Sequence, residues 1–257
     1  MNQEKFLCSE TGVKVYLKPE YHPDLKGTDL SHPDFVRKAR ELFSDKHGKV
    51  KGLLRICSEN SEDAQTWMHF SPLLSMSPQR KGNWLEAFLE ESTKRKTKQD
   101  LVRTLRHAKL LFWRGKKAEP IYKSPPNLGC PEGNTEVDLT ILAEKVIIFV
   151  EAKYRSEISM HTTHCPNRDQ IIRNIDVGTY YAWNEGLDFY FILITSSNCM
   201  KSREILRRYS DDPQTIVDRV PHRADIPNKI GQIADNMGSM TWNILPRIGK
   251  KRVLREI

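Results

Sequence analysis

The sequence lacks several features that would assign it to a familiar class of protein. It contains no run of eighteen apolar residues, so we expect no membrane-spanning helix. The first ten residues, MNQEKFLCSE, lack a basic start followed by an apolar stretch, so we expect no secretory signal and a cytoplasmic location. The five cysteines are scattered and include no C-x-x-C pair, which argues against a disulfide framework or a structural zinc site.

Motifs for several common chemistries are also missing. No glycine-rich phosphate-binding loop is present, so the use of ATP is not indicated. Neither G-x-S-x-G nor H-E-x-x-H occurs, and serine hydrolase and zinc protease chemistry therefore lack support. Residues 161–165 (HTTHC) look like part of a zinc site, but a fourth ligand is missing nearby. We interpret this segment as the border of an active site.

The chain does carry an excess of positive charge. Its 257 residues include 41 lysines and arginines against 33 aspartates and glutamates, for a net charge of +8. A polyanion such as nucleic acid is therefore a reasonable partner. The basic run that contains Lys94, Arg95 and Lys96 is a candidate for phosphate contacts, as is the tail from Arg247 to Arg255. Such contacts would be salt-sensitive and independent of base sequence.

Helical patterns dominate the first half of the chain. Residues 32–45 carry apolar side chains at helical spacing. Ser61 is a suitable N-cap for a helix that begins at Glu62, and another short helix begins at Asn83. The residues after the basic run predict an amphipathic helix, with one side formed by Leu101, Leu105, Ala108 and Phe112.

Strand patterns begin at residue 135. Residues 135–142 and 145–154 indicate two strands joined by a tight turn near Ala143-Glu144. Residues 167–183 then predict a helix with isoleucines facing inward, and residues 188–197 predict a buried strand. The last three of these elements form a βαβ unit, so we expect a mixed sheet with a right-handed crossover.

These patterns predict an α/β fold with a mixed β-sheet core in β-β-α-β order. Helices would flank the sheet, and the N-terminal portion would be helical. We expect an N-terminal extension over residues 1–60, a core over residues 61–200, and a helical and basic C-terminal segment over residues 201–257. The C-terminal segment would pack on the same domain as the core.

Three charged residues interrupt the two strands where these otherwise look like core. Glu151 and Lys153 share one face because side chains alternate along a strand. The expected turn sets Asp138 opposite Phe149, on the face of Glu151 and roughly 7 Å from it between Cβ atoms. Two carboxylates at that separation can reach one cation, and the backbone carbonyl of Ala152 can supply another oxygen. Such a site suits Mg²⁺ or Mn²⁺.

Lys153 indicates which chemistry this group of residues performs. Beside a divalent ion, its amine can orient or deprotonate a water molecule and stabilise negative charge on a phosphoryl group. A metal ion lowers the pKa of bound water and neutralises charge in the transition state. The combination predicts hydrolysis of a phosphodiester.

At these residues the sequence resembles the PD-(D/E)xK, or restriction-endonuclease-like, nuclease superfamily. The matching segments are EVDLTI with Asp138 and FVEAK with Glu151 and Lys153, and the order of elements fits the family core. Val137 stands where the family usually has a proline. The resemblance, which covers about 140 residues between 60 and 200, implies that the two carboxylates hold the metal and that the lysine is catalytic.

Two further features of the family have candidates here. Many members carry a glutamate on the helix before the hairpin that helps to bind the metal or its water. Glu62 and Glu86 are the candidates, and we favour Glu62 because SEDA-x-TW looks similar to a segment of bacterial nuclease-like proteins. Many members also place a polar residue on the helix after the lysine strand. Gln170 fits this role, and Arg173 can contact a phosphate.

The residues and the resemblance together predict a Mg²⁺-dependent endonuclease, with Mn²⁺ as a substitute, that cleaves DNA in restriction, defence against foreign DNA or repair. A homodimer would suit cleavage of both strands. Two alternatives stay open. One is a catalytically inactive nucleic-acid-binding module of the same fold, against which the intact Asp138, Glu151 and Lys153 argue. The other is an adaptor whose basic tail binds an acidic protein.

Overall fold

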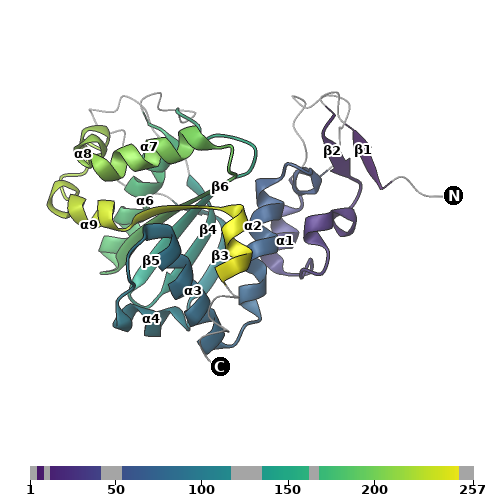
Figure 1. Ribbon diagram of the computed structural model, residues 1–257, viewed down its shortest axis with the longest axis horizontal. Coiled ribbons are helices and arrows are strands. Elements are labelled where there is room, and N and C mark those ends of the chain that lie inside the picture. Colours follow the sequence, from purple (N-terminus) through teal and green to yellow (C-terminus); the bar gives the residue numbers. More distant parts are fainter. Residues whose placement is uncertain (1–4, 9–11, 42–53, 117–134, 162–167, 249–257) are drawn as a thin grey trace. The chain divides into compact units, whose positions relative to one another are not determined.

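The computed structural model describes five stretches of the chain: residues 5–8, 12–41, 54–116, 135–161 and 168–248 (Figure 1). The chain divides into two compact units, Met1–Met76 and Ser77–Ile257. This division differs from the expected boundaries at residues 60 and 200. The helix that begins at Glu62 belongs to the first unit, and the C-terminal segment belongs to the same unit as the sheet.

The first unit combines a short β-hairpin with two helices. These elements are β1 (Phe6–Cys8), β2 (Lys14–Tyr16), α1 (Pro33–Lys38) and α2 (Glu62–Phe70). The Ser61 hydroxyl accepts a hydrogen bond from the Ala64 N–H at 3.0 Å, which confirms the predicted cap of α2. Trp67 packs against Phe35 with 5.3 Å between ring centroids. The helix predicted over residues 32–45 is shorter than expected, since α1 ends at Lys38 and residues 39–41 are not helical; residues 42–45 lie outside the described residues.

The second unit contains a five-stranded mixed β-sheet in the order β3-β4-β5-β6-β7 (Figure 1). The strands are β3 (Lys109–Lys116), β4 (Thr135–Ala143), β5 (Val146–Lys153), β6 (Asp188–Thr195) and β7 (Met237–Thr241). The β3–β4 and β4–β5 pairs are antiparallel, whereas the β5–β6 and β6–β7 pairs are parallel. Helix α6 (Gln170–Asn184) connects β5 to β6. The expectation of an α/β fold with a mixed sheet is therefore confirmed.

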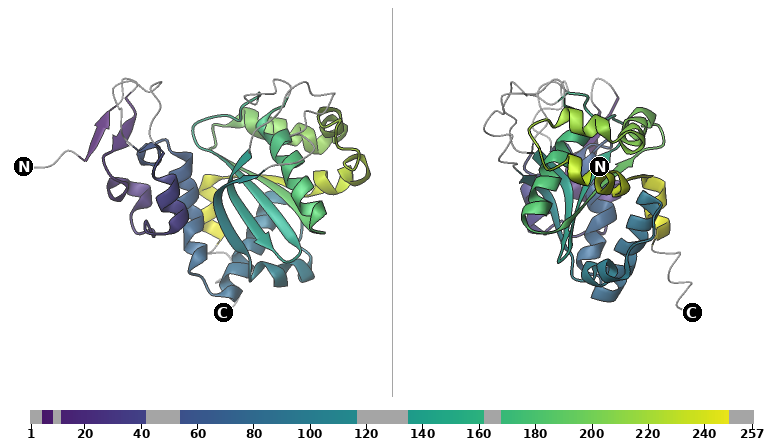
Figure 2. Two further views of the ribbon diagram at one scale, coloured as in Figure 1. Left: turned by 180° about the vertical axis from the view of Figure 1, so that it is seen from behind. Right: turned by 90° about the vertical axis from the view of Figure 1, so that its left-hand side faces the viewer.

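Helices lie on both sides of this twisted sheet, as the views in Figure 2 show. Besides α6 they are α3 (Pro78–Thr93), α4 (Gln99–Leu105), α7 (Met200–Asp211), α8 (Gln214–Arg219) and α9 (Ile230–Asp235). None of the described helices is long and apolar enough to cross a membrane.

Helix α6 packs closely on one face of the sheet. Its predicted inward residues Ile171, Ile172 and Ile175 are fully buried in the main core cluster. A Cβ atom added at Gly178 would lie 2.0 Å from the ring of Phe189, so only glycine allows this approach of helix and strand. The ring of Phe189 therefore meets the backbone of α6 directly.

Helix α3 covers the opposite face. A Cβ atom at Gly238 of β7 would lie 2.6 Å from the carbonyl of Ser92 in α3. Gly238 follows Met237, which points into the core beneath α6, and neighbouring residues of a strand point to opposite faces. The sheet therefore separates α3 from α6.

Two strands differ from the sequence expectations. The segment 109–116 was predicted as part of an amphipathic helix, but α4 ends at Leu105 and β3 follows it. Pairing with β4 along most of its length stabilises β3 as a strand. The edge strand β7 was not predicted from the sequence. Both strands depend on partners distant in the chain, which local periodicity does not reveal.

The tight turn between β4 and β5 consists of Glu144 and Lys145, one residue later than predicted. Ala143 therefore pairs with Val146, and the predicted partner of Asp138 is wrong. The physical reason is burial: this turn exposes the two charged residues and buries the two apolar residues that flank it.

A cluster of buried charges, the Asp176 cluster, joins α6 to the segment after α8. It consists of Asp176, Arg168, His222 and Arg223. The carboxylate of Asp176 is fully buried and lies 2.9 Å from Arg168 Nη2, 2.8 Å from His222 Nε2 and 2.9 Å from Arg223 Nη1. Burial acts to raise the pKa of Asp176, but the hydrogen bond with His222 and the arginine charges lower it to about 2.

Candidate active site

Glu151 and Lys153 lie at the carboxyl end of β5, a strand in which every residue is buried. Only 4% of Glu151 and 6% of Lys153 is exposed. Lys153 Nζ is 2.8 Å from Glu151 Oε1, as expected for side chains two positions apart on a strand. Apolar residues at buried positions often stabilise a fold as well as an ion pair does. The burial of this ion pair makes the end of β5 a candidate functional site.

Asp138 of β4 reaches the same segment. Its Oδ2 accepts a hydrogen bond from the backbone N–H of Ala152 at 2.8 Å, between Glu151 and Lys153. The N–H and C=O of one residue in an extended strand point to the same side, so the Ala152 carbonyl is also directed toward β4. The predicted group of Asp138, Glu151, Ala152 and Lys153 is thus brought together, although through a different strand register.

Neighbouring elements hold the end of β5 in place. The carbonyl oxygen of Lys153 accepts two hydrogen bonds, from the Ser196 N–H at 3.1 Å and from the indole N–H of Trp242 at 3.0 Å. Both donors come from residues that directly follow β6 and β7 in the chain. The backbone under the lysine is therefore fixed by both parallel strands.

Asn174 is a member of this site that the sequence reasoning missed. Its Nδ2 donates hydrogen bonds to Glu151 Oε2 and to the Gln170 carbonyl, both at 3.0 Å. The side chain is 2% exposed. The available signal was its position one helical turn after Gln170, on the same side of α6. The residues predicted on that side are Gln170 and Arg173.

Two buried oxygen atoms beside the ion pair have no hydrogen-bond donor among the described residues. They are Asn174 Oδ1 and Thr195 Oγ1. Thr195 is the register partner of Lys153 and therefore shares its face of the sheet. Buried acceptors without a donor are costly and uncommon. A water or a cation beside the ion pair could bind both oxygens.

Gln170 and Arg173 make other contacts. Gln170 Oε1 accepts a hydrogen bond from the Ser159 N–H at 2.8 Å, which ties the segment after β5 to the start of α6. Arg173 Nε donates to Thr135 Oγ1 at 2.7 Å, at the start of β4. These contacts position the borders of the site, and a direct role toward substrate stays a prediction for both residues.

The backbone of β3 is distorted across from Asp138. Trp113 is buried and has a φ of +49°, in the left-handed region. Its neighbours on β3 pair with the residues on either side of Asp138. A bulky residue in this conformation costs on the order of 1–3 kcal/mol, and such strain is most often found near functional sites.

The two candidates for a helix glutamate lie in different units. Glu62 begins α2 in the first unit, whereas Asp138 and Glu151 belong to the second. Glu86 lies on α3, which covers the sheet face opposite α6. The choice between them stays open.

The basic run is partly neutralised by carboxylates of the protein. Lys94 Nζ is 2.8 Å from Glu91 Oε1, and Arg95 Nη2 is 2.6 Å from Asp235 Oδ1. Lys96 is exposed. Exposed pairs of this kind are weak and exchange readily with other anions. Most of the basic tail and of the 161–165 segment lies outside the described residues.

Across the described stretches, no group of three or more histidine, cysteine, aspartate or glutamate residues could hold a metal ion. The chain matches no protein-family model, and no curated protein or solved structure shows significant similarity to it. We therefore infer function from the chemistry of the residues at the end of β5.

Proposed function

We propose that this chain is a metal-dependent endonuclease of the restriction-endonuclease-like type that hydrolyses DNA phosphodiester bonds. The observation that carries the proposal is the buried Lys153–Glu151 pair, with the Asp138 carboxylate bound between the two residues at the end of β5. The succession β4, β5, α6, β6 is compatible with that fold. The net charge of +8 favours a polyanionic substrate.

The oxygen donors at this site fit Mg²⁺, with Mn²⁺ as a substitute. Mg²⁺ is commonly bound by one or two carboxylates, and waters fill its other positions. Asp138 and Glu151 would supply the carboxylates and Ala152 a carbonyl, and the buried Asn174 Oδ1 offers a further acceptor for a metal-bound water. The bound ion would lower the pKa of a water molecule and neutralise charge on the phosphoryl oxygens.

The protein groups have distinct roles in this proposal. Lys153 orients the attacking water and stabilises negative charge on the phosphoryl group. Asn174 fixes the Glu151 carboxylate through its 3.0 Å hydrogen bond. The Ser196 and Trp242 donors hold the Lys153 backbone, so that its ammonium keeps a defined position.

The second candidate is a nucleic-acid-binding module of the same fold that does not cleave. The basic character of the chain supports binding in either case. The buried, incompletely hydrogen-bonded group at β5 favours the enzyme, because a binding module has no need to bury a lysine and a glutamate.

Cleavage of plasmid DNA tests the proposal. The wild type is incubated with DNA and Mg²⁺, with and without chelator, beside Lys153→Ala. Lys145→Ala is the matched control, since Lys145 lies in the exposed turn of the same hairpin and its partner among the described residues is the surface residue Asp100, at 3.3 Å. We expect chelator to abolish cleavage, Lys153→Ala to lower its rate by about 10²–10⁴-fold, and Lys145→Ala to keep it.

A DNA-binding assay separates the alternatives. Lys153→Ala should bind DNA as well as the wild type does. Equal cleavage by both proteins would show that the site is assigned wrongly. Binding without cleavage by the wild type, in Mg²⁺ and in Mn²⁺, would favour the inactive module. A parallel digestion of single-stranded RNA determines whether the substrate is DNA.

A further inference from the structure

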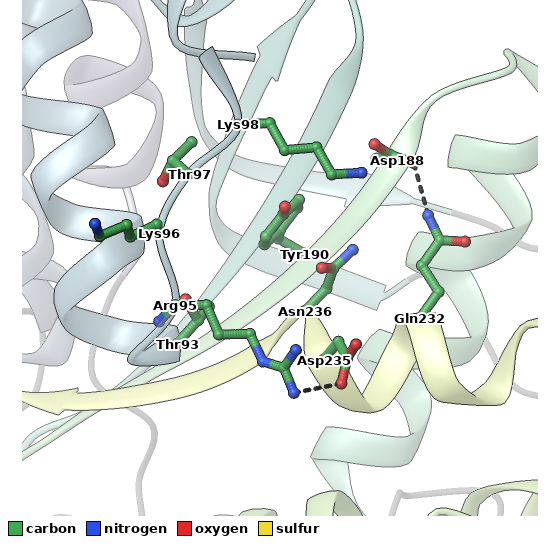
Figure 3. Close-up of a pocket in the computed structure, with 10 residues that line it drawn as sticks. All are labelled: Thr93, Arg95, Lys96, Thr97, Lys98, Asp188, Tyr190, Gln232, Asp235 and Asn236. Carbon is green, nitrogen blue, oxygen red and sulfur yellow. Dashed lines mark hydrogen bonds and ion pairs between the residues drawn. The ribbon is translucent and has the colours of Figure 1, made fainter. Parts of the chain in front are cut away.

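A polar cavity of about 530 Å³ lies in the second unit, apart from the β5 site (Figure 3). One wall is the segment from Thr93 to Lys98, which joins α3 to α4. The other wall comes from the start of β6 and from α9, and Tyr190 of β6 lies between them (Figure 3). Tyr190 is three residues before Leu193, the register partner of Glu151. It therefore faces the opposite side of the sheet, roughly 10 Å away along the strand.

Several side chains around the cavity are already bound to one another. Arg95 Nη2 lies 2.6 Å from Asp235 Oδ1, and Gln232 Nε2 donates to Asp188 Oδ1 at 2.7 Å. The ammonium groups of Lys96 and Lys98 differ from these side chains, since neither has a hydrogen bond or ion pair with any residue that the structure describes. Figure 3 shows the Lys98 side chain extended across the cavity toward Asp188.

Lys96 provides an internal comparison with Lys98. Both are exposed lysines of the same segment, and both line the cavity. In Figure 3 the Lys96 side chain points away from Tyr190, whereas Lys98 reaches over the space above it. Of these two lysines, Lys98 is therefore the one placed to contact an anion seated between the two walls.

The wall formed by β6 and α9 offers an aromatic ring and hydrogen-bonding groups. Burial, together with the charges of Asp188 and Asp100, raises the pKa of the Tyr190 hydroxyl, so it remains a donor at neutral pH. The Asn236 amide lies beside this ring in Figure 3. The carboxylate of Asp188 uses one oxygen for Gln232. An oxygen on that wall can therefore accept a hydrogen bond from a ligand.

We propose that this cavity binds a nucleoside monophosphate. Lys98 and the Tyr190 hydroxyl would contact the phosphoryl group, and the tyrosine ring would support the base. Asp188 and Asn236 would accept hydrogen bonds from the N–H groups of the base. The volume lies in the usual range for small-ligand pockets and excludes a duplex. The proposal does not depend on the nuclease assignment.

Titration calorimetry of the full chain with AMP, GMP, CMP and UMP tests the proposal. We expect at least one nucleotide to bind with a Kd below about 1 mM. Ribose 5-phosphate, inorganic phosphate and the matching nucleoside should each bind at least about tenfold more weakly, because each lacks one of the recognised groups. Inorganic phosphate that binds as tightly as the nucleotide, or no binding by any of the four nucleotides, would overturn the proposal.

Variants locate the ligand within the protein. Lys98→Gln should weaken binding at least about tenfold, and Tyr190→Phe about threefold, whereas Lys96→Gln, with the same change in charge, should stay within about twofold of wild type. Glu151→Gln should keep full nucleotide binding and lose cleavage. Equal losses in Lys96→Gln and Lys98→Gln would show diffuse attraction and overturn the assigned site. Thermal unfolding of each variant verifies that it is folded.

Discussion

Helix α6 contacts two groups of buried charges that differ in how completely their oxygen acceptors are hydrogen-bonded. In the Asp176 cluster, both carboxylate oxygens of Asp176 contact cationic side chains or His222 at 2.8–2.9 Å, although His222 Nδ1 is buried without a partner in the described chain. At the end of β5, the Glu151 carboxylate is bound by Lys153 and Asn174, but Asn174 Oδ1 and Thr195 Oγ1 are buried without a donor in the described chain.

The difference separates a structural role from a chemical one. A buried carboxylate whose acceptors are all occupied has no capacity left for a ligand, and removing it leaves cations without a partner. Spare acceptors beside an ion pair instead leave capacity for a water or a metal ion. We therefore expect changes in the Asp176 cluster to alter stability, and changes at the β5 site to alter catalysis.

Removal of the central carboxylate from the Asp176 cluster should have the largest effect. Asp176→Asn removes the buried anion that Arg168 and Arg223 both contact, and we expect it to lower the free energy of unfolding by about 3–5 kcal/mol. Urea denaturation measures this loss. Asp225→Asn is the control, because Asp225 is exposed and also pairs with Arg223, at 2.7 Å. It should cost less than about 1 kcal/mol. Similar values for the two variants would contradict a stabilising role for the cluster.

Asp138→Asn should impair cleavage strongly and change stability little. The amide oxygen can still accept the Ala152 N–H, so the unfolding free energy should change by less than about 1 kcal/mol. Loss of the anionic ligand should lower the cleavage rate by about 10²–10³-fold, which corresponds to several kcal/mol of transition-state stabilisation. Plasmid cleavage at saturating Mg²⁺ measures it. Normal cleavage combined with a large loss of stability would contradict a catalytic role for Asp138 and indicate a stabilising one.

Acid should weaken the Asp176 cluster in a defined interval. The folded-state pKa is about 2 against an ordinary value of 3.8, which corresponds to about 2 kcal/mol of stability. Because the folded pKa is lowered, this contribution is complete above about pH 4 and is lost as the pH falls toward 2. The difference in unfolding free energy between wild type and Asp176→Asn should therefore shrink over that interval. A difference that grows on acidification would be incompatible with this explanation.

Asn174→Ala should have the smallest of these effects. It removes the hydrogen bond that fixes Glu151, while both carboxylates and Lys153 remain. We expect about tenfold slower cleavage and weaker binding of Mn²⁺. The matched control is Asn184→Ala at the exposed end of the same helix, which should cleave like the wild type. Mn²⁺ titrations of the cleavage rate distinguish lost metal affinity from a general loss of folded protein.

Local patterns predicted the part of the site that lies on one strand. The spacing of Glu151 and Lys153 is enough to place both side chains on one face, whatever their neighbours do. Asp138 was assigned to the same group with an incorrect register, because the sequence around the turn allows two hairpins that differ by one residue. Whether the three groups bind a metal and cleave DNA stays a prediction.

The features that the sequence did not predict depend on contacts between distant segments of the chain. Asn174 reaches Glu151 because of the rotation of α6 against the sheet, which helical periodicity alone does not define. Strand β3 follows from pairing with β4, although its apolar residues also suit a helix. Tertiary pairing outweighs local propensity at such positions.

The close approach of Gly178 to Phe189 also determines the position of Asn174 at the β5 site. Gly178 lies one turn after Asn174, and any larger side chain there would push the helix outward from β6. The amide of Asn174 would then withdraw from Glu151, although no chemical group of the site had been replaced. A random screen for impaired variants should therefore recover this buried glycine together with the charged residues themselves.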